Sequence, residues 1–190
     1  LPAGPQPTGV VVCHPHPLYG GDMQNNVVTA LVETFQAAGL PTLRFNFRGV
    51  GSSGGAHGDG QAEQADVVGA VDFLLSRATA VPKVVVVGYS FGAMVGLSAG
   101  AEDPRVQALV GVGTPVERID PEPLQTAAKP LLLVSGDADH ISPLDGLQAL
   151  VDRFDDSTQL VALPGADHFF SGREAEAARV VLKFIESLEP

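Results

Sequence analysis

The sequence is poor in cysteine, in basic residues and in long hydrophobic runs. Cys13 is the one cysteine in 190 residues, so the chain cannot form an intramolecular disulfide and lacks the framework of a disulfide-stapled secreted domain. No apolar run approaches the roughly 18 residues that a membrane helix needs, so we expect no membrane insertion. Only 11 Lys and Arg stand against 22 Asp and Glu, a formal net charge of −11. Such a chain repels phosphate backbones, which disfavours nucleic-acid binding.

The apolar content, in contrast, is sufficient for a hydrophobic core. Hydrophobic residues make up 45% of the chain and charged residues 17%, which excludes a disordered tail. The length favours a single domain over residues 1–190, with a proline-rich tail at residues 1–8. The 22 glycines and 15 prolines suit a fold with many junctions between strands, loops and helices.

Short apolar runs alternate with amphipathic stretches along the chain. The expected strands are residues 10–13, 42–47, 83–87, 108–112, 131–134 and 159–163. The expected helices are residues 25–38, 61–78, 92–101, 144–154 and 174–188. Four of the strands are nearly continuous Val and Leu runs, as in strands buried on both faces of a parallel sheet. We therefore predict an α/β fold with a mostly parallel sheet of about six strands, helices on both faces and ligand sites at the carboxyl ends of the strands.

The segment Gly88-Tyr89-Ser90-Phe91-Gly92 fits the pattern G-x-S-x-G and lies between an expected buried strand and an expected small-residue helix. In this context the pattern predicts a tight turn that exposes a nucleophilic serine. The small residues at 88 and 92 relieve crowding at such a turn. The helix that follows would place its positive dipole end beneath the reacting oxygen.

A serine nucleophile needs a base and an acid that orients the base. His168 follows the last expected strand, on the same edge of the sheet as Ser90, and is our candidate base. Asp137 and Asp139 both follow the strand at 131–134. We prefer Asp139, which lies far enough beyond the strand to reach a histidine loop, and expect Asp137 to make turn hydrogen bonds.

The oxyanion of an acyl-transfer reaction needs two backbone N–H donors. Phe91, directly after the nucleophile, is one candidate. The other should come from the loop 14–21, in which the two prolines have no N–H to donate. We choose His16 first, and Leu18 or Tyr19 second.

Two other patterns carry weaker alternatives. His14 and His16 could suggest a metal pair, but they lack matched partners, so we expect neither a metal nor a cofactor. Residues 49–54 match G-x-G-x-x-G, a dinucleotide-binding pattern. More glycines follow them instead of a helix, so we expect this loop to have a structural role.

Together these segments resemble the α/β-hydrolase superfamily over nearly the whole chain from Val10 onward. The motifs CHPHPLYGG, TLRFNFRGVGSSGG, GYSFG, SGDAD and ADHFF are similar to those of small, capless serine hydrolases near the dienelactone-hydrolase-like enzymes. The resemblance implies Ser90 as nucleophile, Asp139 as acid, His168 as base and the HPHP loop as oxyanion contributor. It also implies two further strands ahead of Val10, where this chain has a short proline-rich piece. Dienelactone hydrolases carry cysteine where this chain has Ser90, which argues against that specific activity.

These observations predict a serine hydrolase that cleaves small or short-chain esters or thioesters, because the connection 113–129 is too short for a large lid. A non-catalytic interaction protein of the same fold, a peptidase and an acyltransferase remain alternatives. The expected partner is a small acyl substrate, and the expected state is a monomer or a homodimer. We expect a cytoplasmic protein; the start at Leu1 without a methionine leaves a removed signal peptide open.

Overall fold

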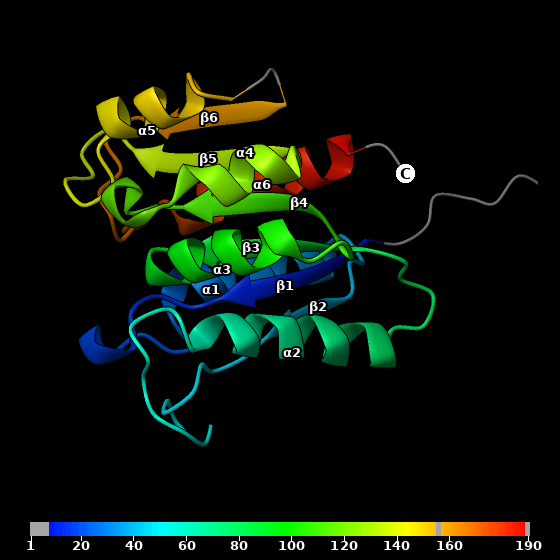
Figure 1. Cartoon of the computed structure of the whole chain (residues 1–190). Coiled ribbons are helices and arrows are strands. Elements are labelled where there is room, and N and C mark those ends of the chain that lie inside the picture. The colour runs from blue at the N-terminus through cyan, green and yellow to red at the C-terminus, as the bar shows by residue number, and fades with distance from the viewer. Residues whose placement is uncertain (1–7, 155–156, 189–190) are drawn as a thin grey trace, which may run out of the picture.

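A computed structural model describes residues 8–154 and 157–188, and its centre is an all-parallel sheet of six strands (Figure 1). The strands are β1 (Gly9–Cys13), β2 (Thr42–Arg44), β3 (Val84–Tyr89), β4 (Val106–Val112), β5 (Leu131–Gly136) and β6 (Thr158–Leu163). Their order across the sheet is β2-β1-β3-β4-β5-β6. Because all six are parallel, their carboxyl ends meet at one edge, and the loops that follow them share that edge.

Helices cover both faces of this sheet. They are α1 (Asn26–Ala37), α2 (Glu63–Arg77), α3 (Phe91–Glu102), α4 (Pro121–Ala127), α5 (Leu144–Val151) and α6 (Glu174–Ser187). Two single-turn 3₁₀ helices are η1 (Pro17–Tyr19) and η2 (Val116–Arg118). Helices α1 and α6 pack on one face, and α2 to α5 pack on the other (Figure 1). The predicted fold class is confirmed.

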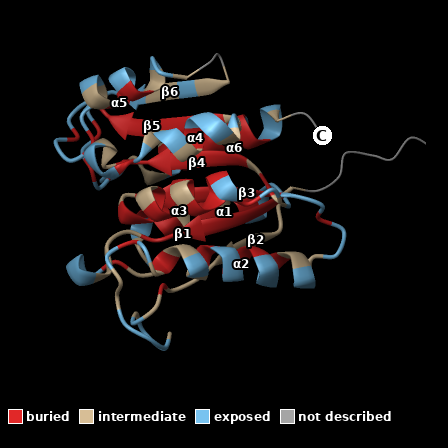
Figure 2. Ribbon diagram, in the orientation of Figure 1, coloured by how far each residue is buried: buried red, intermediate tan, exposed pale blue. Residues whose placement is uncertain are grey.

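The central strands are buried along their whole length, which explains their continuous Val and Leu runs (Figure 2). Successive side chains of a strand point to opposite faces. In β3, Val85 and Val87 contact the α1 and α6 side, whereas Val84 and Val86 contact the α2 and α3 side. Apolar side chains are therefore needed at every position, and the sequence supplies them.

The edge strand β2 is shorter than predicted, because it ends at Arg44 and not at residue 47. Beyond Arg44 the polar groups of the chain bind side chains and other loops in place of a neighbouring strand. The Phe47 N–H donates to Nε2 of His14 at 3.0 Å, and the side chain of Asn46 accepts from the Met23 N–H at 2.8 Å. The strand expected over residues 42–47 therefore forms only in its first half.

The connection between β4 and β5 contains η2 and α4, where the sequence predicted a loop. Asp120 caps α4 by accepting from the Glu122 N–H at 3.1 Å, and Pro121 occupies the first helical position. Leu124 of α4 packs in the same core as α3. The segment lies on the body of the protein and forms no large lid, as predicted.

Two sequence predictions concern the chain ends and membranes. Residues 1–7 of the predicted proline-rich tail lie outside the described residues, whereas Thr8 accepts a hydrogen bond from the Gln107 side chain. Among the helices in the described part of the chain, none combines the length and the apolar character needed to cross a bilayer.

Candidate active site

Ser90 lies in a strained turn between β3 and α3. Its backbone has φ 54° and ψ −117°, a conformation that costs a non-glycine residue about 1–3 kcal/mol. The two flanking glycines are required by close packing. A Cβ on Gly88 would lie 2.2 Å from the carbonyl oxygen of Gly92, and one on Gly92 would lie 2.4 Å from that of Cys13. The chain therefore folds tightly enough here to hold the serine hydroxyl clear of the turn.

The structure brings Ser90, His168 and Asp139 into one hydrogen-bonded row. Nε2 of His168 lies 3.0 Å from Oγ of Ser90, and Nδ1 lies 2.8 Å from Oδ2 of Asp139. The three residues follow β3, β6 and β5, so the parallel sheet delivers them to a common edge. Since a carboxylate only accepts hydrogen bonds, Nδ1 carries the ring proton and Nε2 can accept from the serine hydroxyl.

Asp139 is buried and ionised. Burial alone would raise the pKa of its carboxyl group, but the hydrogen bond and charge of His168 hold this pKa below its usual range. The amides of Ile141 and Ser142 add to this effect, because both donate to Oδ1 at 2.8 Å. A fixed carboxylate of this kind can orient His168 and stabilise its protonated form.

Asp137, the alternative acid, points elsewhere. Its exposed carboxylate accepts a hydrogen bond from the Gly165 N–H at 2.6 Å, in the loop after β6. The contact joins the loop after β5 to the loop after β6, whereas we expected Asp137 to bond within its own turn. Of the two aspartates, only Asp139 lies against His168 in the described structure, so it stays our candidate for the acid.

Tyr89 holds the loop of His168, the candidate base, and the sequence did not suggest this contact. Its hydroxyl donates to the backbone carbonyl of His168 at 3.0 Å, and the two rings lie 5.7 Å apart. Burial, with a smaller contribution from the Asp139 charge, raises the pKa of this phenol. Tyr89 therefore stays protonated and keeps donating to the base loop.

The two candidate oxyanion donors lie side by side. The rings of His16 and Phe91 have centroids 4.8 Å apart. Within the described residues, neither backbone N–H has a hydrogen-bond acceptor. The amides of our second choices are already used: Leu18 donates to Nδ1 of His16 and Tyr19 to the His16 carbonyl. His16 and Phe91 thus remain the candidates.

His14 connects the loop after β1 with the loop after β2. Its ring is fully buried; Nε2 accepts from the Phe47 N–H at 3.0 Å, and Nδ1 lies 2.7 Å from the Pro15 carbonyl oxygen. Nδ1 must therefore carry the proton and donate it to that carbonyl. Burial lowers the pKa of the ring, which keeps it neutral. Both ring nitrogens are used inside the protein, so His14 shapes the candidate oxyanion loop and is not available as a metal ligand.

A second histidine–carboxylate pair, His57 with Glu63, lies close to Phe91, and the sequence analysis did not single it out. Nδ1 of His57 lies 2.9 Å from Oε1 of Glu63, although the contact lacks the alignment of a hydrogen bond. The carboxylate of Glu63 is fully buried and accepts from the amides of Gly58 and Gly60. Burial opposes its ionisation, but these amides and His57 hold its pKa below the usual range. In the sequence, His57 and Glu63 show only as polar residues in and after a glycine-rich loop. Hydrophobic periodicity does not indicate that two such residues will be in contact.

The glycine-rich segment 49–54 forms a closed turn and not a nucleotide-binding one. The Gly49 N–H donates to the Gly54 carbonyl, and the Ser53 N–H donates to that of Val50. Helix α2 begins only at Glu63, so no helix N-terminus follows this turn directly. The geometry agrees with the structural role that we predicted.

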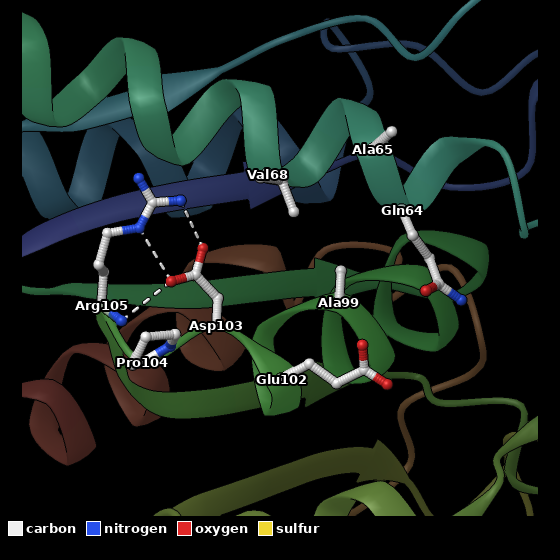
Figure 3. Close-up of a pocket in the computed structure, with 8 residues that line it drawn as sticks. All are labelled: Gln64, Ala65, Val68, Ala99, Glu102, Asp103, Pro104 and Arg105. Atoms are coloured by element: carbon white, nitrogen blue, oxygen red, sulfur yellow. Dashed lines mark hydrogen bonds and ion pairs between the residues drawn. The ribbon is translucent and has the colours of Figure 1, made fainter.

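A hollow lies at the far end of α3 (Figure 3). Its charged groups are Glu102, Asp103 and Arg105; Asp103 and Arg105 bind each other, and Arg105 also pairs with Asp72. Lys129 donates to two carbonyls nearby, those of Gly100 and Asp103. These contacts tie the end of α3 to its neighbours and leave no unpaired cation at this place for a ligand.

Cys13 ends β1 beneath the candidate site. Its side chain is fully buried, and burial raises the pKa of its thiol. The thiol therefore stays protonated and packs as a small apolar group.

Comparisons with known proteins agree with this architecture. A family model described as "alpha/beta hydrolase fold" matches residues 10–127. An uncharacterized protein of Rickettsia prowazekii is 30% identical over 187 residues, which is 94% of this chain and 79% of the relative. A solved alpha-beta serine hydrolase homologue from Coxiella burnetii is 35% identical, with a TM-score of 0.84 over 96% of this chain and 87% of that one. A serine hydrolase without a lid from Xanthomonas campestris is 29% identical, with a TM-score of 0.86 over 100% and 87%.

Proposed function

Because the chain belongs to the alpha/beta hydrolase fold family, and is a hydrolase on that ground, we propose that it cleaves small or short-chain carboxylic esters or thioesters through an acyl-enzyme. The observation that carries this proposal is the hydrogen-bonded row from Ser90 through His168 to Asp139. Nucleophile, base and orienting acid stand within direct contact at the carboxyl edge of the sheet, which is the arrangement that acyl transfer needs.

The proposed reaction begins with attack of Ser90 Oγ on the substrate carbonyl carbon, while His168 Nε2 takes the hydroxyl proton. The tetrahedral intermediate carries an oxyanion that accepts hydrogen bonds from the N–H groups of Phe91 and His16. His168 then gives its proton to the leaving alcohol or thiol. A water molecule, activated by the same ring, hydrolyses the acyl-enzyme and restores Ser90. Asp139 holds the tautomer of His168 throughout.

Replacement of the nucleophile tests the chemistry. A fluorophosphonate probe should label the wild-type protein at Ser90, and Ser90→Ala should abolish both labelling and ester hydrolysis. The matched control is Ser52→Ala, at an exposed serine of the glycine-rich loop, which should be labelled like the wild type. Labelling that persists in Ser90→Ala would contradict the proposal. Absence of labelling in a folded wild-type protein would favour a non-catalytic role.

The substrate preference follows from the β4–β5 connection. This connection consists largely of η2 and α4, and Leu124 of α4 packs into the core beneath α3. Few of its residues are therefore free to enclose a long acyl chain. We expect kcat/KM for p-nitrophenyl esters to be highest for acetate or butyrate and to fall with longer chains. A preference for long-chain triglycerides would refute this assignment while leaving the triad chemistry intact.

A further inference from the structure

Three side chains from two loops gather beside Phe91, outside the proposed triad. His16 belongs to the loop after β1, and His57 and Asp59 belong to the segment between β2 and α2. One possible ligand atom of each residue lies within 4.8 Å of the other two. The ring centroids of His16 and His57 are 5.1 Å apart, and they lie 4.8 Å and 5.4 Å from that of Phe91. The fold thus assembles two imidazoles and a carboxylate at one point.

We propose that His16, His57 and Asp59 bind a divalent transition-metal ion of the zinc class. Two imidazole nitrogens and one carboxylate oxygen form a common donor set for zinc, with a fourth position left for water. Imidazole ligands disfavour magnesium and calcium, which prefer oxygen donors. The site lies outside the triad, so it does not depend on the proposed ester hydrolysis.

Glu63 gives His57 the support that metal-binding histidines commonly have. Such histidines direct their second ring nitrogen at a carboxylate or carbonyl, which fixes the ring and its tautomer. Nδ1 of His57 lies 2.9 Å from the Glu63 carboxylate, which is fully buried and anchored by the amides of Gly58 and Gly60. Nδ1 faces this anion, although without the alignment of a hydrogen bond; a proton on Nδ1 is thereby favoured, which leaves the lone pair of Nε2 for a metal.

The charges and the loop contacts also suit a cation. Asp59 and Glu63 bring two carboxylates to the histidine pair, and their charge exceeds that of Arg118, the cation near His16. Coordination through Nδ1 of His16 would displace the hydrogen bond that the Leu18 N–H donates to this atom at 3.2 Å. This bond is exposed and joins residues two apart, so its loss opposes binding only weakly. The bound ion would connect the loop after β1 to the loop before α2.

Metal titration of the full chain tests the site. Protein freed of metal with a chelator should bind one Zn²⁺ per chain by isothermal titration calorimetry, and Mg²⁺ should give no binding heat. Zn²⁺ should also raise the melting temperature, because it binds only the folded loops. His57→Gln and Asp59→Asn should each weaken Zn²⁺ binding by at least about 10-fold, the scale of loss typical even for outer-shell partners of a metal.

Matched variants keep the test decisive. Asp59 is exposed, so Asp59→Asn tests the site even if His57→Gln disturbs the fold. The control is His140→Gln, which removes an exposed histidine of another loop and should keep the Zn²⁺ affinity of the wild type. Absence of Zn²⁺ binding by the wild type would overturn the proposal. Equal Zn²⁺ affinity of Asp59→Asn and wild type would overturn it as well.

Discussion

The two histidine–carboxylate pairs, His168 with Asp139 and His57 with Glu63, have similar parts and different surroundings. In both pairs a ring Nδ1 lies close to a buried carboxylate oxygen, at 2.8 Å in the pair of His168 and at 2.9 Å in the pair of His57. The other contacts of each carboxylate are backbone amides. The pair of His168 and Asp139 forms an aligned hydrogen bond, and the second ring nitrogen of His168 meets Ser90 Oγ. The ring of His57 faces the His16 ring and Asp59 instead.

The difference shows what distinguishes a candidate catalytic pair from one with another role. Burial and a carboxylate whose pKa lies below its usual range occur in both pairs, so neither property identifies the reaction. The distinguishing feature is the group at the far nitrogen of the ring. A nucleophile there favours acyl transfer, whereas further ligand atoms favour binding of a cation. Two substitutions and one change of pH test whether the two pairs have different roles.

Loss of the acid at the first pair should have the largest effect. Asp139→Asn should lower kcat on the order of 10⁴-fold, by analogy with the serine-protease triad, because an amide no longer enforces the tautomer that accepts the serine proton. Steady-state hydrolysis of p-nitrophenyl acetate measures this. Asp137→Asn is the matched control and should lose far less activity. A larger loss in Asp137→Asn would reverse our choice of acid.

The equivalent change at the second pair should act on stability. Glu63→Gln places an NH₂ group toward the backbone amide of Gly58 or Gly60 and removes a buried charge-assisted hydrogen bond. The free energy of unfolding should fall by about 2 kcal/mol, which urea denaturation can measure. Ester hydrolysis by the folded variant should change far less than in Asp139→Asn. If both variants lost activity equally, the comparison would fail and both pairs would have to be catalytic.

Acid pH should lower the free energy of unfolding, because it protonates the carboxylates of both pairs. Since the folded-state pKa of Asp139 and of Glu63 lies below the ordinary values of 3.8 and 4.5, the unfolded chain binds more protons near these values. The stabilisation is present above the ordinary pKa and is lost as pH falls through the folded-state pKa. Denaturation midpoints measured from about pH 6 to about pH 3 should fall less steeply in Glu63→Gln than in the wild type. Parallel curves would show that Glu63 is not ionised in the fold.

Much of the fold followed from local patterns. The buried strands were predictable because each is apolar on both faces, and the main helices because apolar residues recur on one side. The end of β2 and the helix α4 were not predicted. Residues 45–47 satisfy their polar groups with partners that lie far away in the sequence, such as His14. Helix α4 is short, and its start depends on a single Asp120 cap followed by Pro121.

The sequence by itself determined the tight turn at Ser90, because Gly88 and Gly92 are the only residue type that its packing admits. It also placed His168 and two aspartates after strands, and it favoured Asp139 over Asp137 as the acid. Only the tertiary structure brought Asp139 against His168, and only it brought His57 and Asp59 to His16. The physical reason is that these contacts join loops after different strands. Their distances depend on how the sheet and the loop paths pack, and no local pattern encodes that.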